Sequence, residues 1–172
     1  MDGQLFKMKD KLVSIGECGL DYDRLNYSSK EQQLEVFPYH FDLAEKYKLP
    51  LYLHNRNTGN DFFDIVKKNR NRFTSGVVHS FTGTLQELKQ IVELDLFVGL
   101  NGCSFKTQEN LDVVKHVPLD RIMLETDAPY CEIRPSHAGS KMVKNKMPDK
   151  KKRTADYLLK GRNEPCKILN VL

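Results

Sequence analysis

The sequence predicts an α/β fold in which parallel strands alternate with helices, as in a TIM-type (β/α) barrel. Short apolar runs recur along the chain, and the stretches between them carry apolar residues at helical spacing. Four runs end in a side chain that can bind a divalent metal: residues 12–17, 51–54, 76–79 and 122–127. Successive strand ends lie 22 to 37 residues apart, as expected of βαβ units. Because a (β/α) barrel gathers the carboxyl ends of its strands, these side chains are expected to meet.

The first predicted strand ends at Glu17. The sequence SSKE at residues 28–31 then predicts a capping box, in which a hydroxyl and a carboxylate satisfy the free N–H groups at a helix start. Pro38 falls inside the helical pattern that follows. An interior proline removes a hydrogen bond and clashes with the preceding turn, so we expect a kink there.

The second and third strands are predicted to end at His54 and His79. Between them, a helix over residues 61–69 is expected to turn its apolar side chains inward, namely Phe62, Phe63 and Val66. The sequence TLQE at residues 84–87 forms a second capping box, which starts a helix through about Leu94.

The last predicted elements repeat the pattern. A fourth strand over residues 96–100 ends at Asn101, and Thr107 is expected to cap a helix that stops before Pro118. The final strand is predicted over residues 121–127.

The composition indicates one domain, residues 1–172. Hydrophobic residues make up 40% and charged residues 29% of the chain, as is usual for globular proteins. Neither a membrane-spanning run nor an apolar secretory segment is evident. The four cysteines form no Cys-x-x-Cys pair, so we expect four free thiols in a reducing compartment. These features favour an intracellular protein, nuclear or cytoplasmic, that does not associate with membranes.

Positive charge is concentrated in the last part of the chain. Residues 1–140 contain 17 basic and 20 acidic residues, whereas residues 141–172 contain 10 basic and 3 acidic ones. The centre of this excess is a predicted basic loop over residues 141–153. It could lie against a polyanion and release counterions, or it could be an ordinary solvated loop.

The strand ends supply two imidazoles and two carboxylates: Glu17, His54, His79 and Asp127. Such a mixed set suits zinc, manganese or, with more water, magnesium. A carboxylate can bridge two ions, and two ions about 3.5 to 4 Å apart activate water for phosphoryl displacement. A structural hydrogen bond or a helix cap is the alternative for each residue taken alone. The four together favour a metal-dependent hydrolase.

Several segments, in order, resemble the signature segments of the TatD-related deoxyribonucleases. These segments are IGECGLD (15–21), LHNR (53–56), VHSFTG (78–83) and ETDAP (125–129). Three further segments are similar to the eukaryotic TatD domain-containing branch: NGCS (101–104), SHAGSK (136–141) and RNEP (162–165). The resemblance extends from about Lys11 to the end of the chain.

The resemblance implies a TIM-barrel metallohydrolase that cleaves phosphodiester bonds in DNA by means of metal-activated water. It implies two divalent ions per site, magnesium first, with manganese or zinc as alternatives. The metal ligands would be the matching residues Glu17, His54, His79 and Asp127, with Glu17 as the bridging group. DNA would be the partner.

Other residues are candidates for catalysis or substrate binding. Glu125 lies two positions before Asp127 and so faces the same side of an extended strand, which would let it support the ligands or handle a proton. Arg56 and Arg162 would suit phosphate oxygens, although a surface salt bridge is the alternative for each. His137 could bind substrate and protonate a leaving oxygen.

The chain is shorter than the family's barrel. A full (β/α)₈ barrel takes roughly 250 residues, and the predicted strands correspond to the family's fourth through eighth. We therefore expect a truncated barrel, incomplete at the N-terminus and at the C-terminus. The absent first strand carries a His-x-His metal pair in many members. Two open edges would invite pairing with another chain, in a homodimer for example.

Three functions follow as alternatives. The first is an active metal-dependent deoxyribonuclease, and the second is a related metallohydrolase acting on small esters or amides. The third is an inactive fragment or isoform that acts as a binding or oligomerising module.

Overall fold

The computed structural model describes residues 11–144, 148–152 and 157–172. The chain divides into two compact units. The first comprises the residues up to His79 together with 90–97, and the second comprises 80–89 together with 98–172. Within the predicted basic loop, residues 145–147 and 153 lie outside the described residues. None of the described helices is long and apolar enough to cross a membrane.

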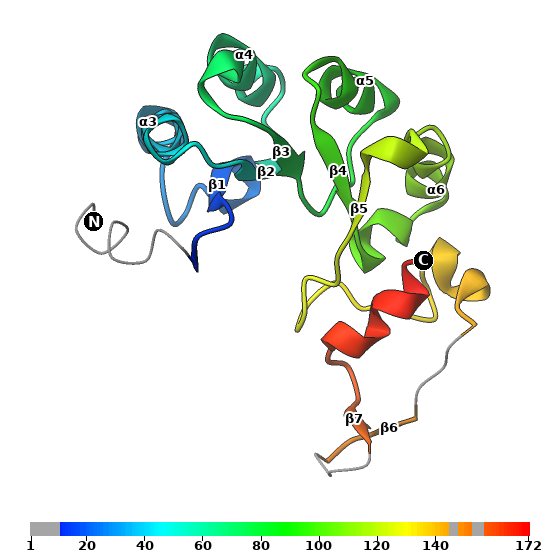
Figure 1. Ribbon diagram of the computed structural model, residues 1–172. Coiled ribbons are helices and arrows are strands. Elements are labelled where there is room, and N and C mark those ends of the chain that lie inside the picture. The colour runs from blue at the N-terminus through cyan, green and yellow to red at the C-terminus, as the bar shows by residue number, and fades with distance from the viewer. Residues whose placement is uncertain (1–10, 145–147, 153–156) are drawn as a thin grey trace. The chain divides into compact units, whose positions relative to one another are not determined.

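The first unit contains three parallel strands in chain order (Figure 1). They are β1 (Ile15–Asp21), β2 (Leu51–Arg56) and β3 (Gly76–Val78). Leu51 in the middle strand pairs with Ile15 on one side and with Gly76 on the other. The predicted parallel pairing is thus confirmed. The first strand, however, continues four residues past Glu17, where the sequence was expected to leave the sheet.

Helices α2 (Lys30–Val36) and α3 (Tyr39–Tyr47) replace the single kinked helix that was expected. Pro38 is the N-cap of α3, where its missing N–H and fixed φ do little harm. The capping box of α2 is also shifted by one residue from the prediction, because Ser29 and Gln32 form it.

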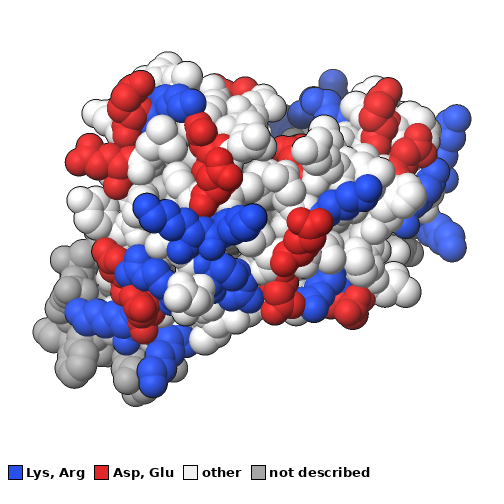
Figure 2. All heavy atoms as spheres, turned by 90° about the horizontal axis from the view of Figure 1, so that it is seen from above, with Lys and Arg blue, Asp and Glu red and all other residues white. Residues whose placement is uncertain are grey.

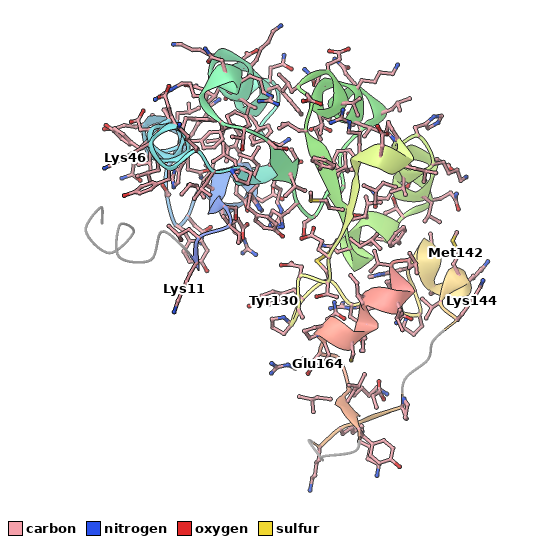
Figure 3. All side chains as sticks on the ribbon, in the orientation of Figure 1. Lys11, Lys46, Tyr130, Met142, Lys144 and Glu164 are labelled. Carbon is pink, nitrogen blue, oxygen red and sulfur yellow. A yellow bond between two sulfur atoms is a disulfide. The ribbon has the colours of Figure 1, made fainter. Side chains whose placement is uncertain are left out.

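Aromatic side chains from the helices form the core of the first unit. Phe62 of α4 (Asp61–Lys68) is fully buried and stacks on Phe37 with ring centroids 5.8 Å apart. The Phe37 ring also lies 5.1 Å from that of Phe41 in α3. Figure 3 shows side chains filling the space between these helices and the strands. The predicted inward positions on α4 are confirmed, since Phe62, Phe63 and Val66 are all buried.

The second unit is built on β4 (Phe97–Leu100) and β5 (Ile122–Leu124), which pair in parallel. Helix α6 (Gln108–Val114) connects them and is capped by Thr107 as predicted. Helix α5 (Leu85–Glu93) precedes β4 and begins with the predicted box of Thr84 and Glu87. Strand β5 ends three residues before the predicted end at Asp127.

Short elements complete the second unit. They are the 3₁₀ helices η4 (Gly102–Phe105), η5 (Leu119–Arg121), η6 (Ala138–Met142) and η7 (Pro165–Asn170), and the parallel pair β6 (Asp149–Lys150) and β7 (Leu158–Leu159).

Cys103 and Cys131 form a disulfide with their Cα atoms 5.1 Å apart. The bond joins the segment after β4 to the segment after β5. Cys18, which is buried, and Cys166, which is exposed, are free. The expectation of four free thiols was therefore wrong for one pair. The two cysteines are 28 residues apart and meet only because β4 and β5 pair, which their spacing does not show.

Candidate metal centre

Three of the four predicted metal ligands converge in the first unit. The Oε1 atom of Glu17 lies 2.8 Å from Nε2 of His79 and 3.0 Å from Nδ1 of His54. The two ring nitrogens are themselves 3.0 Å apart. One side-chain atom from each residue therefore points at the same small volume. Together these residues form a group that could hold a metal ion.

A bulge in β1 turns Glu17 toward this volume. Gly16 pairs with Tyr52 and Cys18 pairs with Leu53, so the residue between them has no counterpart on β2. Ile15 and Cys18 are both buried although they are three positions apart, an odd spacing that a regular strand would place on opposite faces. The extra residue restores the core pattern after it and re-aims the Glu17 side chain, a usual role of bulges beside active sites.

Strand periodicity and pairing place the two histidines. Leu51 and Leu53 of β2 point into the core, which leaves His54 on the opposite face. His79 follows β3 directly, and its N–H donates to the Leu53 carbonyl at 2.9 Å, so the ladder fixes its backbone. The Tyr52 ring packs 4.8 Å from the His79 ring. His79 is consequently buried, whereas the Glu17 side chain is half exposed.

The size of the ligand triangle suits a small divalent ion. Nitrogen and oxygen ligands about 2.0 to 2.2 Å from a tetrahedral ion are about 3.3 to 3.6 Å apart. The triangle found here has sides of 2.8 to 3.0 Å and needs to open by only about half an ångström. Two imidazoles and a carboxylate are also a donor set that zinc, manganese and magnesium enzymes use. The residues present therefore fit a metal.

Asp21 lies beside this cluster, although no strand-end pattern predicts it as a site residue. Its Oδ2 atom lies 3.0 Å from His54 Nε2, on the far side of the ring from Glu17. The same oxygen pairs with Nη1 of Arg56 at 3.3 Å. The register that sets Gly19 opposite His54 and Asp21 opposite Arg56 brings these groups together. The one available signal was that Asp21, like Glu17, lies on β1 within the IGECGLD segment.

In the second unit, Glu125 anchors the turn that follows β3. Its Oε1 atom accepts a hydrogen bond from the Ser80 N–H and another, at 3.4 Å, from Nδ2 of Asn101. Asn101 is fully buried and also donates to Oγ of Ser80 at 2.5 Å. Glu125 therefore fixes the start of the second unit at Ser80. Its predicted role in supporting the ligands or handling a proton stays a prediction.

Asp127 lies in the segment after β5 and has a left-handed backbone, with φ of 52°. Its carbonyl accepts from the Tyr130 N–H at 2.8 Å, which closes a tight turn. Its Oδ2 atom is 3.3 Å from Sγ of Cys131. Tyr130 itself is 71% exposed, and Figure 3 shows it at the outside of this segment. The role of Asp127 as a fourth ligand stays a prediction.

The predicted substrate-binding residues are engaged in local contacts. Arg162 pairs with Glu164 at 3.2 Å, as Arg56 does with Asp21. Nδ1 of His137 accepts from the Arg134 N–H at 3.2 Å. Burial lowers the pKa of His137, and the charges of Arg134 and Lys106 lower it further. The Nδ1 atom of His137 is occupied by this contact. Its role in protonating a leaving oxygen stays a prediction.

Acidic and basic side chains are interspersed over the face shown in Figure 2. Many of them pair; in the first unit, for example, Arg72 contacts Asp42 at 2.5 Å and Glu45 at 2.8 Å. The second unit contains a cavity of about 1150 Å³ whose wall includes several basic side chains. These are Arg134, Lys141, Lys160 and Lys167, the last paired with Glu132.

Known proteins are similar to this chain in sequence. The profile of the family described as TatD related DNase matches residues 4–171. A protein named deoxyribonuclease Tat-D from Schizosaccharomyces pombe is 49% identical over 165 residues, which cover 93% of this chain and 53% of that protein. The chain spans about half the length of the curated relatives it matches.

Solved structures show the same likeness. A hydrolase TatD family protein from Entamoeba histolytica aligns with a TM-score of 0.91 at 38% identity, over 97% of this chain and 56% of that one. An uncharacterised amidohydrolase from Saccharomyces cerevisiae aligns with a TM-score of 0.80 at 33% identity, over 98% of this chain and 63% of that one. The predicted fold class, part of a TIM-type barrel, is confirmed. By its matched profile, its relatives and its fold, the chain belongs to the TatD-related DNase family.

Proposed function

We propose that this protein is a metal-dependent deoxyribonuclease that hydrolyses phosphodiester bonds in DNA. The observation that carries the proposal is the convergence of Glu17, His54 and His79 on one volume. The names of the relatives, deoxyribonuclease among them, support the choice of substrate.

Divalent ions, two per site and magnesium first, are part of the proposal. Glu17, His54 and His79 would hold metal, Glu17 would bridge, and Asp127 would complete the ligand set. A bound ion supplies an activated water and offsets the negative charge that develops on the phosphate.

The chain's own residues would orient the substrate around that chemistry. The buried His79 and the Tyr52 ring exclude water from one side of the ligand volume. Glu17 is half exposed and so borders the open side, from which a phosphate could approach. Arg56 is also substantially exposed, and its guanidinium has donors left over from the single contact with Asp21. It could therefore bind a phosphate oxygen without leaving Asp21.

The test is cleavage of end-labelled oligonucleotides by the purified chain with Mg²⁺, with and without a chelator. Chelation and the substitution Glu17→Ala should each abolish cleavage, because each removes metal from the site. His40→Ala is the matched control, since His40 lies on α3 and contacts the Phe37 carbonyl rather than the cluster. Cleavage that persists both in chelator and in Glu17→Ala would contradict the proposal. Labels at the 5′ and 3′ ends, together with a circular substrate, separate exonuclease from endonuclease action.

A second candidate function is that of a self-associating module. Among the described residues, β1 and β5 are the edge strands. Apolar side chains are exposed at both: Val13, just before β1, is 81% exposed, and Met123 in β5 is 43% exposed. Open parallel edges of this kind favour pairing with a second copy. Sedimentation equilibrium would decide the matter: a dimer weakened by Met123→Lys supports this candidate, and a monomer at all concentrations removes it.

The third alternative, hydrolysis of a small ester or amide, shares the same ligand set. Competition distinguishes it from nuclease action. If small esters are cleaved and oligonucleotides do not inhibit, this alternative replaces the first.

An intracellular location, nuclear or cytoplasmic, also stays a proposal. Reducing compartments keep most thiols free, so the Cys103–Cys131 pair gives it a direct check. Thiol trapping in intact cells, combined with fractionation, should find the protein inside the cell with this pair at least partly reduced.

A further inference from the structure

His54 lies between two carboxylates that contact different nitrogens of its ring. Nε2 is 3.0 Å from Oδ2 of Asp21, and Nδ1 is 3.0 Å from Oε1 of Glu17. A neutral imidazole has one N–H and one lone pair, so it can donate to only one of the two. Nδ1 is the nitrogen that lies inside the cluster, and it is free to bind a metal only if the hydrogen is on Nε2.

We propose that Asp21 is a positioning residue that holds His54 in the Nε2–H tautomer and so presents the Nδ1 lone pair to the metal. The inference rests on the proposed metal centre and deepens it. An ionised carboxylate can only accept, so its contact with Nε2 requires the hydrogen to be there. A ligand histidine whose second nitrogen donates to a carboxylate is a general arrangement in metal sites.

Asp21 is better placed than Glu17 to take the hydrogen. Its side chain is 19% exposed, against 50% for Glu17, so water competes less for its oxygens. Oε1 of Glu17 lies closer to Nε2 of His79, at 2.8 Å, than to His54.

The Asp21 carboxylate is fixed by its surroundings. Its Oδ1 atom accepts from the Asp23 N–H at 3.0 Å, which leaves Oδ2 for His54 and Arg56. Gln33 of α2 holds the backbone from both sides: its Oε1 atom accepts from the Asp21 N–H at 2.7 Å, and its Nε2 donates to the Asp21 carbonyl at 2.9 Å. Asp21 is thus held at the end of β1 independently of any ligand.

The competing explanation is that the Asp21 carboxylate only forms a salt bridge with Arg56 and does not orient His54. That contact is longer, at 3.3 Å, and the arginine is 43% exposed, which makes it a weak surface pair. The His54 contact is shorter and joins two side chains that are both less than one-fifth exposed. The two explanations predict different effects of removing Arg56.

The experiment uses the full chain and four variants, with two readouts. Long-range ¹H–¹⁵N spectra of the metal-free protein at pH 8 report the tautomer of His54, and calorimetric titration with Mn²⁺ and Zn²⁺ reports affinity. In Asp21→Asn the amide can present either its oxygen or its NH₂ group, so both tautomers become populated. Asp21→Ala removes the acceptor altogether. Asp23→Asn is the matched control, because it removes the same charge two residues away, and Arg56→Ala removes only the salt bridge.

We expect the Nε2–H tautomer in the parent protein and a 10- to 100-fold loss of metal affinity in Asp21→Asn and Asp21→Ala, as for other second partners of ligand histidines. Asp23→Asn and Arg56→Ala should change affinity by less than about threefold. Circular dichroism and thermal unfolding show whether each variant is folded; if Asp21→Ala is not, Asp21→Asn carries the comparison.

Three outcomes would overturn the proposal: an Nδ1–H tautomer in the parent protein, unchanged affinity in a folded Asp21→Asn, or an equal loss in Arg56→Ala. If the parent protein binds no metal, the proposed function fails. The tautomer spectrum then still decides whether Asp21 controls the ring.

Discussion

The close approach of β1 and β2 at Gly19 leads to a prediction about both stability and metal binding. Gly19 pairs with His54 and has φ of +153°, a backbone conformation that side chains rarely adopt. A Cβ atom at this position would lie 1.9 Å from the His54 carbonyl oxygen and 2.9 Å from its nitrogen. Because these are backbone atoms, Gly19→Ala can be accommodated only if the strands separate locally.

The magnitude has two parts. Backbone strain at such a φ costs on the order of 1 to 3 kcal/mol. Separation of the strands at Gly19 would weaken one or two ladder hydrogen bonds, each worth about 0.5 to 1.5 kcal/mol. We therefore expect Gly19→Ala to lower the free energy of unfolding by about 1.5 to 6 kcal/mol. It should also move His54 by about an ångström, enough to open the 3.0 Å contacts that define the ligand triangle.

The assay is urea unfolding followed by circular dichroism, with Mn²⁺ titration of any folded protein. Gly59→Ala is the matched control, because Gly59 also has a positive φ, of 60°, but an added Cβ would meet no atom within 4 Å. The control should lose about 1 kcal/mol and keep its metal affinity. If Gly19→Ala loses no more stability than Gly59→Ala, the close contact between β1 and β2 does not exclude a side chain at this position.

The remaining predictions concern the core, the disulfide and one histidine. Phe62→Ala should lower the free energy of unfolding, measured in urea, by about 3 to 5 kcal/mol. Leu119 is 90% exposed, so Leu119→Ala should change it by less than about 0.5 kcal/mol. Equal effects of the two substitutions would refute the assigned core. Reduction of the Cys103–Cys131 bond should lower the free energy of unfolding by about 3 to 4 kcal/mol, because it frees a 28-residue loop in the unfolded chain. Mass spectrometry after thiol labelling should confirm the pairing. Because the pKa of His137 is lowered in the folded protein, the unfolded chain binds its proton more readily, and stability should fall as the pH drops below about 6.5. NMR titration should find its midpoint below that value, and a higher one would contradict the assignment.

The clustering of Glu17, His54 and His79 could be predicted from the sequence because parallel strands bring their carboxyl ends together. The choice of candidate ligands needed only the residue types at the ends of apolar runs. The residue at which each strand ends was harder to predict. Glu17 was placed at a strand end, but β1 runs on to Asp21 because a bulge restores its alternation after Glu17.

Features that depend on register or on distant pairing could not be predicted. The contact of Asp21 with His54 follows from the pairing of Gly19 with His54, which no local pattern encodes. The Cys103–Cys131 bond likewise depends on the pairing of β4 with β5. At Pro38 the helical pattern was right but the connection was not, because a proline can begin a new helix as easily as bend an old one.

The bulge in β1 matters to anyone who would transplant this centre onto another parallel sheet. Copying Glu17 onto a regular strand beside the two histidines would fail, since the pleat would send either the carboxylate or the neighbouring core residue to the wrong face. Deletion of a single residue between Ile15 and Cys18 would have the same result in the native chain. The number of residues in this stretch is therefore as much a part of the candidate metal centre as their chemistry.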